Sequence, residues 1–188
     1  MTTTTSLQLG REVYVTDPCY SVPTWCQKKL DNVLPGEWIA SMIYDELEGT
    51  GRNAELHLIH KDYQSKSYAW DWVGDFGVDS GQAGGFHAAS YWDDTAAVRM
   101  QIPNVDFVLP MRDQEGDIWY EAMCKFTLGE DGWGAYDAGV VSSSGWGDGM
   151  YPVYAAHNDA GEIVALQLVF IPQDAEDDEE DEWDEDED

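Results

Sequence analysis

Three short segments of the chain concentrate the side chains that could bind a ligand or a metal ion. Residues 17–20 read Asp-Pro-Cys-Tyr, residues 77–86 place four glycines around one aspartate, and residues 139–152 hold three serines, four glycines and another aspartate. Pro18 fixes its own φ and keeps Asp17 out of the helical region, which holds that carboxylate at the end of a strand. Glycine is expected where the backbone bends sharply, and serine supplies hydroxyl ligands.

An aspartate in each segment suggests a site for a hard cation. If Asp17, Asp79 and Asp148 converge in the fold, their carboxylates form a cluster suited to calcium or magnesium, which prefer oxygen ligands. The chain lacks the alternating acidic loop of an EF-hand, so such a metal site would be irregular. The alternative for each aspartate is an ordinary turn or cap residue.

The same segments could instead hold a small uncharged ligand. The residues expected to line that site are polar or aromatic side chains of the second and third segments: Ser80, Gln82, Ser142, Ser143, Ser144, Trp146 and Tyr151. The competing interpretation is a tight hairpin in which serine and aspartate satisfy the turn backbone. Both interpretations stay open on the sequence.

An enzymatic function is a weaker hypothesis. Clustered aspartates with a divalent ion can activate water for hydrolysis, and His87 follows Asp79 closely enough to be considered as a base. The chain has no Gly-x-Ser-x-Gly elbow, no phosphate-binding loop with its lysine and no His-Glu-x-x-His motif. A binding protein is therefore favoured, with a metal-assisted hydrolase as an alternative.

The elements that must position these segments are mainly strands. Residues 12–16, 37–44, 54–61, 118–126, 139–143 and 162–171 are rich in β-branched or aromatic residues or alternate in polarity. The last run is apolar on one face and mixed on the other, which places it near the middle of a sheet. The chain is predicted to be a β-rich α+β protein, an antiparallel sheet or sandwich with one or two short peripheral helices.

Turn and helix signals complete the expected architecture. Residues 158–161 read Asn-Asp-Ala-Gly and predict a hairpin that joins a strand at 151–156 to the run at 162–171. Helices are expected from Pro23 to about Leu30 and within residues 91–100. The expected organisation is a flexible N-terminus at 1–10, a single β-rich domain at 11–172 and a disordered acidic tail at 173–188.

The three segments, in this order, resemble a family of uncharacterised proteins found in bacteriophage and bacterial genomes. The motifs that carry the resemblance are Asp-Pro-Cys-Tyr, Gly-Val-Asp-Ser-Gly-Gln and Gly-Val-Val-Ser-Ser-Ser-Gly-Trp-Gly-Asp-Gly, and the resemblance covers roughly residues 13–170. It implies a phage-type origin and no established activity. The acidic end of the chain lies outside it.

Charge narrows the class of partner. The chain has 38 acidic and 9 basic residues, a formal net charge of −29, and residues 174–188 carry 13 of those acids, which leaves 25 acidic and 9 basic residues in the rest. Repulsion on this scale opposes direct binding to nucleic acid or to an anionic membrane and favours cations or a basic host protein. A further alternative is an acidic, DNA-mimic-like inhibitor of a host nucleic-acid-binding protein. The run at 174–188 cannot bury enough apolar surface to order itself, and its ordinary role is solubility.

Nothing at the N-terminus suggests export, because residues 1–6 lack both basic residues and an apolar stretch. The three cysteines are an odd number without Cys-x-x-Cys spacing, which fits reduced thiols. A cytoplasmic protein is predicted, that of the host cell if the gene is phage-encoded.

Overall fold

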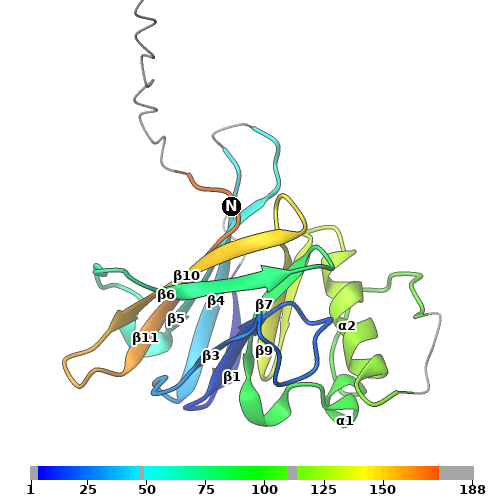
Figure 1. Ribbon diagram of the computed structural model, residues 1–188, viewed down its shortest axis with the longest axis horizontal. Coiled ribbons are helices and arrows are strands. Elements are labelled where there is room, and N and C mark those ends of the chain that lie inside the picture. The colour runs from blue at the N-terminus through cyan, green and yellow to red at the C-terminus, as the bar shows by residue number, and fades with distance from the viewer. Residues whose placement is uncertain (1–3, 47–48, 110–113, 174–188) are drawn as a thin grey trace, which may run out of the picture.

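The computed structural model describes residues 4–46, 49–109 and 114–173, which form two antiparallel β-sheets and short helices (Figure 1). The first sheet has six strands, in the order β1 (Thr4–Leu9), β4 (Gly36–Tyr44), β5 (Asn53–His60), β11 (Ile163–Val169), β10 (Gly149–His157) and β6 (Asp71–Val78). The second has five, in the order β3 (Lys28–Leu30), β2 (Val13–Thr16), β7 (Gln82–His87), β9 (Gly139–Ser143) and β8 (Trp133–Tyr136). The helices are α1 (Asp94–Ala97), α2 (Asp117–Thr127) and the 3₁₀ turns η1 (Lys61–Tyr63) and η2 (Ala88–Ser90).

The main core lies between the two sheets. Along β4, Trp38, Ala40 and Met42 are buried while their neighbours are only half-buried, which is the period of two that a sheet with one covered face produces. Leucines of β5 and β11 and valines of β2 complete this cluster. Burial of these apolar side chains is the main force that holds the sheets together.

A second, smaller core covers the other face of the five-stranded sheet. Phe86 of β7 and Val141 of β9 are fully buried there against Trp119 and Met123 of α2. The molecule therefore has three layers, the six-stranded sheet, the five-stranded sheet and the helical layer, which Figure 1 shows beside β7 and β9.

Most strand predictions are confirmed. The runs at 12–16, 37–44, 54–61, 139–143 and 162–171 correspond to β2, β4, β5, β9 and β11, and β11 lies inside its sheet between β5 and β10, as its apolar faces indicated. The predicted hairpin is the β10–β11 pair, closed by a hydrogen bond from Asn158 N to Glu162 O of 3.0 Å. The β-rich fold with short helices is thus correct.

The prediction of a strand at 118–126 is wrong, because this segment is α2. Ile118, Trp119 and Tyr120 are strong strand formers, but the buried apolar residues recur at i, i+3, i+4 and i+7, namely Trp119, Ala122, Met123 and Phe126. The period of 3.6, rather than local propensity, decided the structure.

Two further predictions need correction. The helix expected from Pro23 to about Leu30 is not formed. The segment ends instead in strand β3, where Leu30 pairs with Val13. Within the supposedly flexible residues 1–10, Thr4–Leu9 is strand β1, which pairs with β4 over six residues. The helix expected within 91–100 is present as α1. The predicted disordered tail lies outside the described residues, apart from Gln173.

The N-terminus of α2 is stabilised by a side chain from α1. Its own N-cap residue is Gly116, which has no side chain to offer, and the Asp94 carboxylate accepts hydrogen bonds from Gly116 N at 3.0 Å and Trp119 N at 2.8 Å. A carboxylate at this end satisfies free amides and interacts favourably with the helix dipole. Asp94 therefore connects the two helices.

Replacement of Asp94 by alanine should destabilise the fold by about 1–2 kcal/mol, the usual loss for a helix cap. Urea unfolding followed by circular dichroism measures this change. Asp106→Asn, at an exposed position, is the matched control and should change the free energy of unfolding by less than about 0.5 kcal/mol. Equal effects of the two variants would contradict the capping role.

Candidate functional site

The Asp17 carboxylate is fully buried and joins the first two predicted segments. Its Oδ1 accepts hydrogen bonds from Cys19 N at 2.8 Å and Ser80 Oγ at 2.6 Å, and its Oδ2 accepts from Asp79 N at 2.8 Å and Ser80 N at 2.7 Å. Four donors on one carboxylate compensate for the loss of its hydration. The β2 end and the β6–β7 turn are consequently fixed to each other.

The third segment lies against this turn. Ser144 N donates to Gly81 O at 3.0 Å, and a Cβ on Gly81 would stand 3.9 Å from the Gly147 Cα. The approach follows from sheet register, since β7 pairs with both β2 and β9, with Thr16 opposite Gly84 and Gln82 opposite Ser143. The structure thus brings the three segments side by side.

The hydroxyl groups predicted to hold a ligand are instead bonded within these turns. Ser144 Oγ and Tyr151 Oη both donate to Gly147 O at 2.8 Å, and Ser142 Oγ donates to Ser143 O at 2.7 Å. Asn53 Nδ2 donates to Ser143 Oγ at 2.9 Å. These hydroxyls therefore support the turn backbone.

Gln82 and Trp146 differ from the hydroxyl groups. Gln82 lies inside the protein, where its Oε1 accepts from Thr127 Oγ1 at 3.0 Å and its Nε2 reaches Ser80 Oγ at 3.4 Å. Trp146 is 48% exposed, and the Arg52 guanidinium lies over its ring, 4.6 Å from the ring centroid. Of these two, only Trp146 is available to a partner.

Asp79 and Asp148 are exposed and lie at the same end of one strand pair. They are the residues next beyond Val78 and Gly149, the last registered pair of β6 and β10. Tyr20 Oη donates a hydrogen bond to Asp79 Oδ2, and this bond, more than burial, raises the pKa of Tyr20. The phenol therefore stays protonated and orients the Asp79 carboxylate.

The cation site at Asp17, Asp79 and Asp148 stays a prediction that this geometry does not favour. Both oxygens of Asp17 are occupied by hydrogen-bond donors, whereas Asp79 and Asp148 are exposed residues beside the end of the β6–β10 ladder. Among residues 4–46, 49–109 and 114–173, no group of three or more His, Cys, Asp or Glu side chains is placed to hold a metal ion.

The ionisable groups around Asp17 are poorly suited to nucleophilic chemistry. Burial, and then the Asp17 charge, raises the pKa of the Cys19 thiol, and burial raises the pKa of the Cys124 thiol. Both thiols stay protonated at neutral pH, and the thiolate is the reactive form. His87 ends β7 at the far end from Asp79, roughly 20 Å away by strand length, so the structure does not bring these two together.

The exposed apolar residues beside the turns were missed by sequence reasoning. Trp25 is 85% exposed and Met150 is 56% exposed. A Cβ on Gly77 would stand 2.8 Å from Cys26 Cβ and 3.4 Å from Met150 Sδ, so the loop that carries Trp25 packs beside Met150. Trp25 lies in the segment for which the sequence predicted a helix, from Pro23 to about Leu30, and no local signal indicated its exposure.

A family model described as "Protein of unknown function (DUF4241)" matches residues 11–168. The matched range includes all three segments and agrees with the resemblance to an uncharacterised family. No curated protein and no solved structure gives a significant match. In the described residues, no helix is long and apolar enough to cross a membrane.

Asp17→Asn should destabilise the fold by about 2–4 kcal/mol, because an asparagine amide turns a donor toward backbone N–H groups and leaves buried donors unpaired. Thermal unfolding should show a lower melting temperature by roughly 5–12 °C. Asp79→Asn is the control: its exposed carboxylate should contribute less than about 1 kcal/mol. If Asp17→Asn lowers the free energy of unfolding by less than about 1 kcal/mol, the buried carboxylate does not have this structural role.

Proposed function

Because this chain belongs to the DUF4241 family, whose function is unknown, we propose from its geometry that it is a binding protein that recognises a positively charged segment of a partner protein. The proposed site is the acidic corner, defined as Asp79 and Asp148 with the exposed side chains of Trp25, Trp146 and Met150. The observation that carries the proposal is the placement of two exposed carboxylates at one ladder end, among exposed aromatic and thioether groups.

Asp79 and Asp148 place two exposed negative charges beside the same end of the β6–β10 pair. A lysine or arginine side chain that binds at this end would be attracted by both carboxylates. The whole chain carries more acidic than basic residues, and the resulting negative field would also speed the approach of a basic partner.

The apolar side chains favour a protein segment over a simple ion. Tryptophan and methionine are enriched in the buried centres of protein interfaces, and apolar residues that gather on a surface mark interaction sites. Trp146 already binds a guanidinium from its own chain, that of Arg52, by a cation–π contact. This contact supports recognition of arginine by the same kind of ring.

The alternatives use only part of these features. A calcium or magnesium ion would need the carboxylates alone, and a DNA-mimicking decoy would need negative charge without Trp25 or Met150. We place the encounter in a reducing compartment such as the cytoplasm, of the host if the gene is phage-borne, because the three cysteines are free thiols.

A ten-residue arginine peptide is a suitable probe, titrated against the full chain and against a chain that ends at Gln173. The shorter chain should still bind, and Asp79→Asn with Asp148→Asn should weaken its binding by about fivefold or more, which is about 1 kcal/mol. Asp106→Asn with Glu130→Gln removes the same charge from exposed positions elsewhere and should change the affinity less than about twofold.

Trp25→Ser should also weaken binding of the peptide, although it leaves the net charge unchanged. This variant therefore distinguishes a defined binding site from attraction by the overall negative charge. If the two double variants lose the same amount of peptide affinity, the proposal is overturned, because the peptide is then attracted by the overall negative charge and not by the acidic corner. A melting temperature raised by calcium at constant ionic strength, in the parent chain but not in the Asp79 and Asp148 variant, would instead establish the cation site.

A further inference from the structure

The exposed ring of Trp146 is presented by a tightly bonded turn. Gly145 and Gly147, on either side of it, have φ values of +62° and +96°, which lie in the left-handed region that favours glycine. Ser144 Oγ and Tyr151 Oη both donate hydrogen bonds to Gly147 O at 2.8 Å. The turn therefore fixes the main chain of Trp146 while it leaves this residue 48% exposed.

The same turn packs against the start of β5, next to Arg52. A Cβ on Gly145 would stand only 2.7 Å from Asn53 O, so glycine is needed for this close approach. The Asn53 side chain is buried, and its Nδ2 donates a hydrogen bond to Ser143 Oγ at 2.9 Å. The main chains of Arg52 and Trp146 are consequently held beside each other by the fold.

The Arg52 guanidinium lies over the Trp146 ring, with its central carbon 4.6 Å from the ring centroid. Within residues 4–46, 49–109 and 114–173 this guanidinium makes no ion pair and no hydrogen bond, so the aromatic ring is the group that holds it. A cation–π contact is weak where water has access to it, and Arg52 is exposed. The Arg52 side chain can therefore leave the ring at little cost, while its main chain stays in place.

We infer that the Trp146 ring is the arginine-binding element of the acidic corner, and that Arg52 occupies this ring until an arginine of the partner takes its place. The inference rests on the proposed function and specifies its partner as a basic segment that contains arginine. The contact with Arg52 shows that the ring accepts a guanidinium in this setting. The exposed Asp148, separated from Trp146 by Gly147 alone, would add attraction for the incoming cation.

Arginine suits this ring better than lysine does. The guanidinium group is planar and weakly hydrated, and it stacks on an aromatic face, whereas the lysine ammonium group is compact and strongly hydrated. The carboxylates of Asp79 and Asp148 attract either cation through charge. The preference for arginine should therefore arise at Trp146, and the general attraction for basic segments at the two aspartates.

The first test compares ten-residue arginine and lysine peptides, titrated by calorimetry against the full chain and against the chain that ends at Gln173. The arginine peptide should bind at least about threefold more tightly than the lysine peptide. Trp146→Leu should remove most of this difference, because it removes the ring and no charge. Asp79→Asn with Asp148→Asn should weaken the binding of both peptides and preserve the difference between them.

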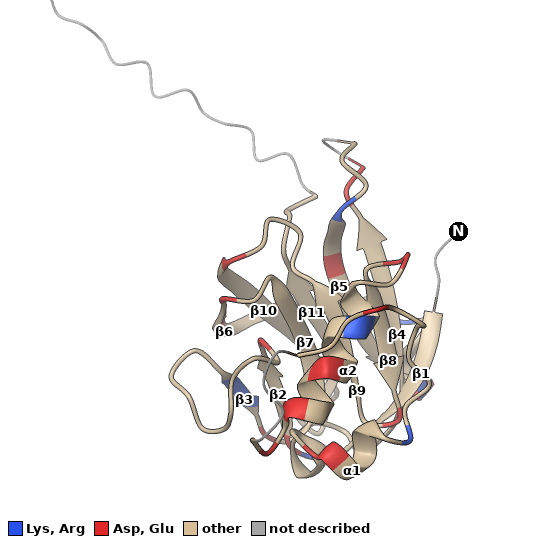
Figure 2. Cartoon of the chain, turned by 90° about the vertical axis from the view of Figure 1, so that its right-hand side faces the viewer, with Lys and Arg blue, Asp and Glu red and all other residues tan. Residues whose placement is uncertain are grey.

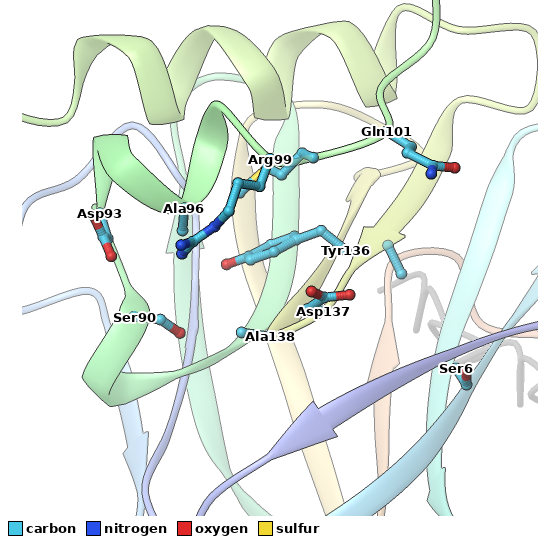
Figure 3. Close-up of a pocket in the computed structure, with 11 residues that line it drawn as sticks. Ser6, Ser90, Asp93, Ala96, Arg99, Gln101, Tyr136, Asp137 and Ala138 are labelled. Carbon is cyan, nitrogen blue, oxygen red and sulfur yellow. The ribbon is translucent and has the colours of Figure 1, made fainter.

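The second test removes the internal competitor. Arg52→Gln should strengthen binding of the arginine peptide by about twofold to fivefold, the ratio that corresponds to an exposed cation–π contact of about 0.5–1 kcal/mol, and should strengthen the lysine peptide less. Arg99→Gln is the matched control, because Arg99 is an exposed arginine beside a pocket that shares no residue with the acidic corner (Figure 3). It removes the same charge and should change the affinity by no more than about 1.5-fold.

NMR observes the displacement directly. The Arg52 Nε–H signal, assigned by its loss in Arg52→Gln, should move when the arginine peptide is added and should move less with the lysine peptide. The inference is overturned if Arg52→Gln acts no more strongly than Arg99→Gln, if Trp146→Leu leaves the difference between the peptides unchanged, or if the Arg52 signal stays in place. The variant of Asp79 and Asp148 still tests the proposed function separately, through its effect on both peptides.

Discussion

The buried Asp17 carboxylate is the interaction on which the arrangement of the three segments depends. The chain passes from the six-stranded to the five-stranded sheet between β6 and β7, and Asp17 binds that turn through Asp79 N and both donors of Ser80. It returns to the six-stranded sheet between β9 and β10, where Ser144 N is bonded to Gly81 O. Two crossings thus lie against each other, and one carboxylate at the end of β2 holds the first of them. A charge in this position is tolerated only because every strong acceptor site has a donor.

These crossings explain the composition of the segments that drew attention first. The backbone has to change direction sharply within a few residues, and Gly81, Gly145 and Gly147 have φ values of +68°, +62° and +96°. Those values lie in the left-handed region, which other residues rarely adopt. The serines satisfy carbonyl groups that the turns leave unpaired. The main role of these motifs is therefore to hold the turns in place. Asp79, Asp148 and Trp146 are the residues of the motifs that remain exposed in the acidic corner.

The sequence predicted the strands well because alternation of apolar residues is local and survives in the fold, as at Trp38, Ala40 and Met42. It did not predict α2, since β-branched and aromatic residues suggested a strand while a helical period was hidden among them. Proximity of the three segments was inferable, but the direction of each hydroxyl was not, because it depends on neighbours such as Asn53.

The negative field of the protein and its exposed apolar side chains would act at different ranges on a basic partner. That field, which the scattered acids in Figure 2 generate together with the rest of the chain, attracts cations and is screened by salt. Contacts of a partner with Trp25 and Met150 would depend instead on burial of apolar surface, which salt screens little. Charge would therefore bring a basic segment to the acidic corner, and apolar contacts would decide which segment stays there.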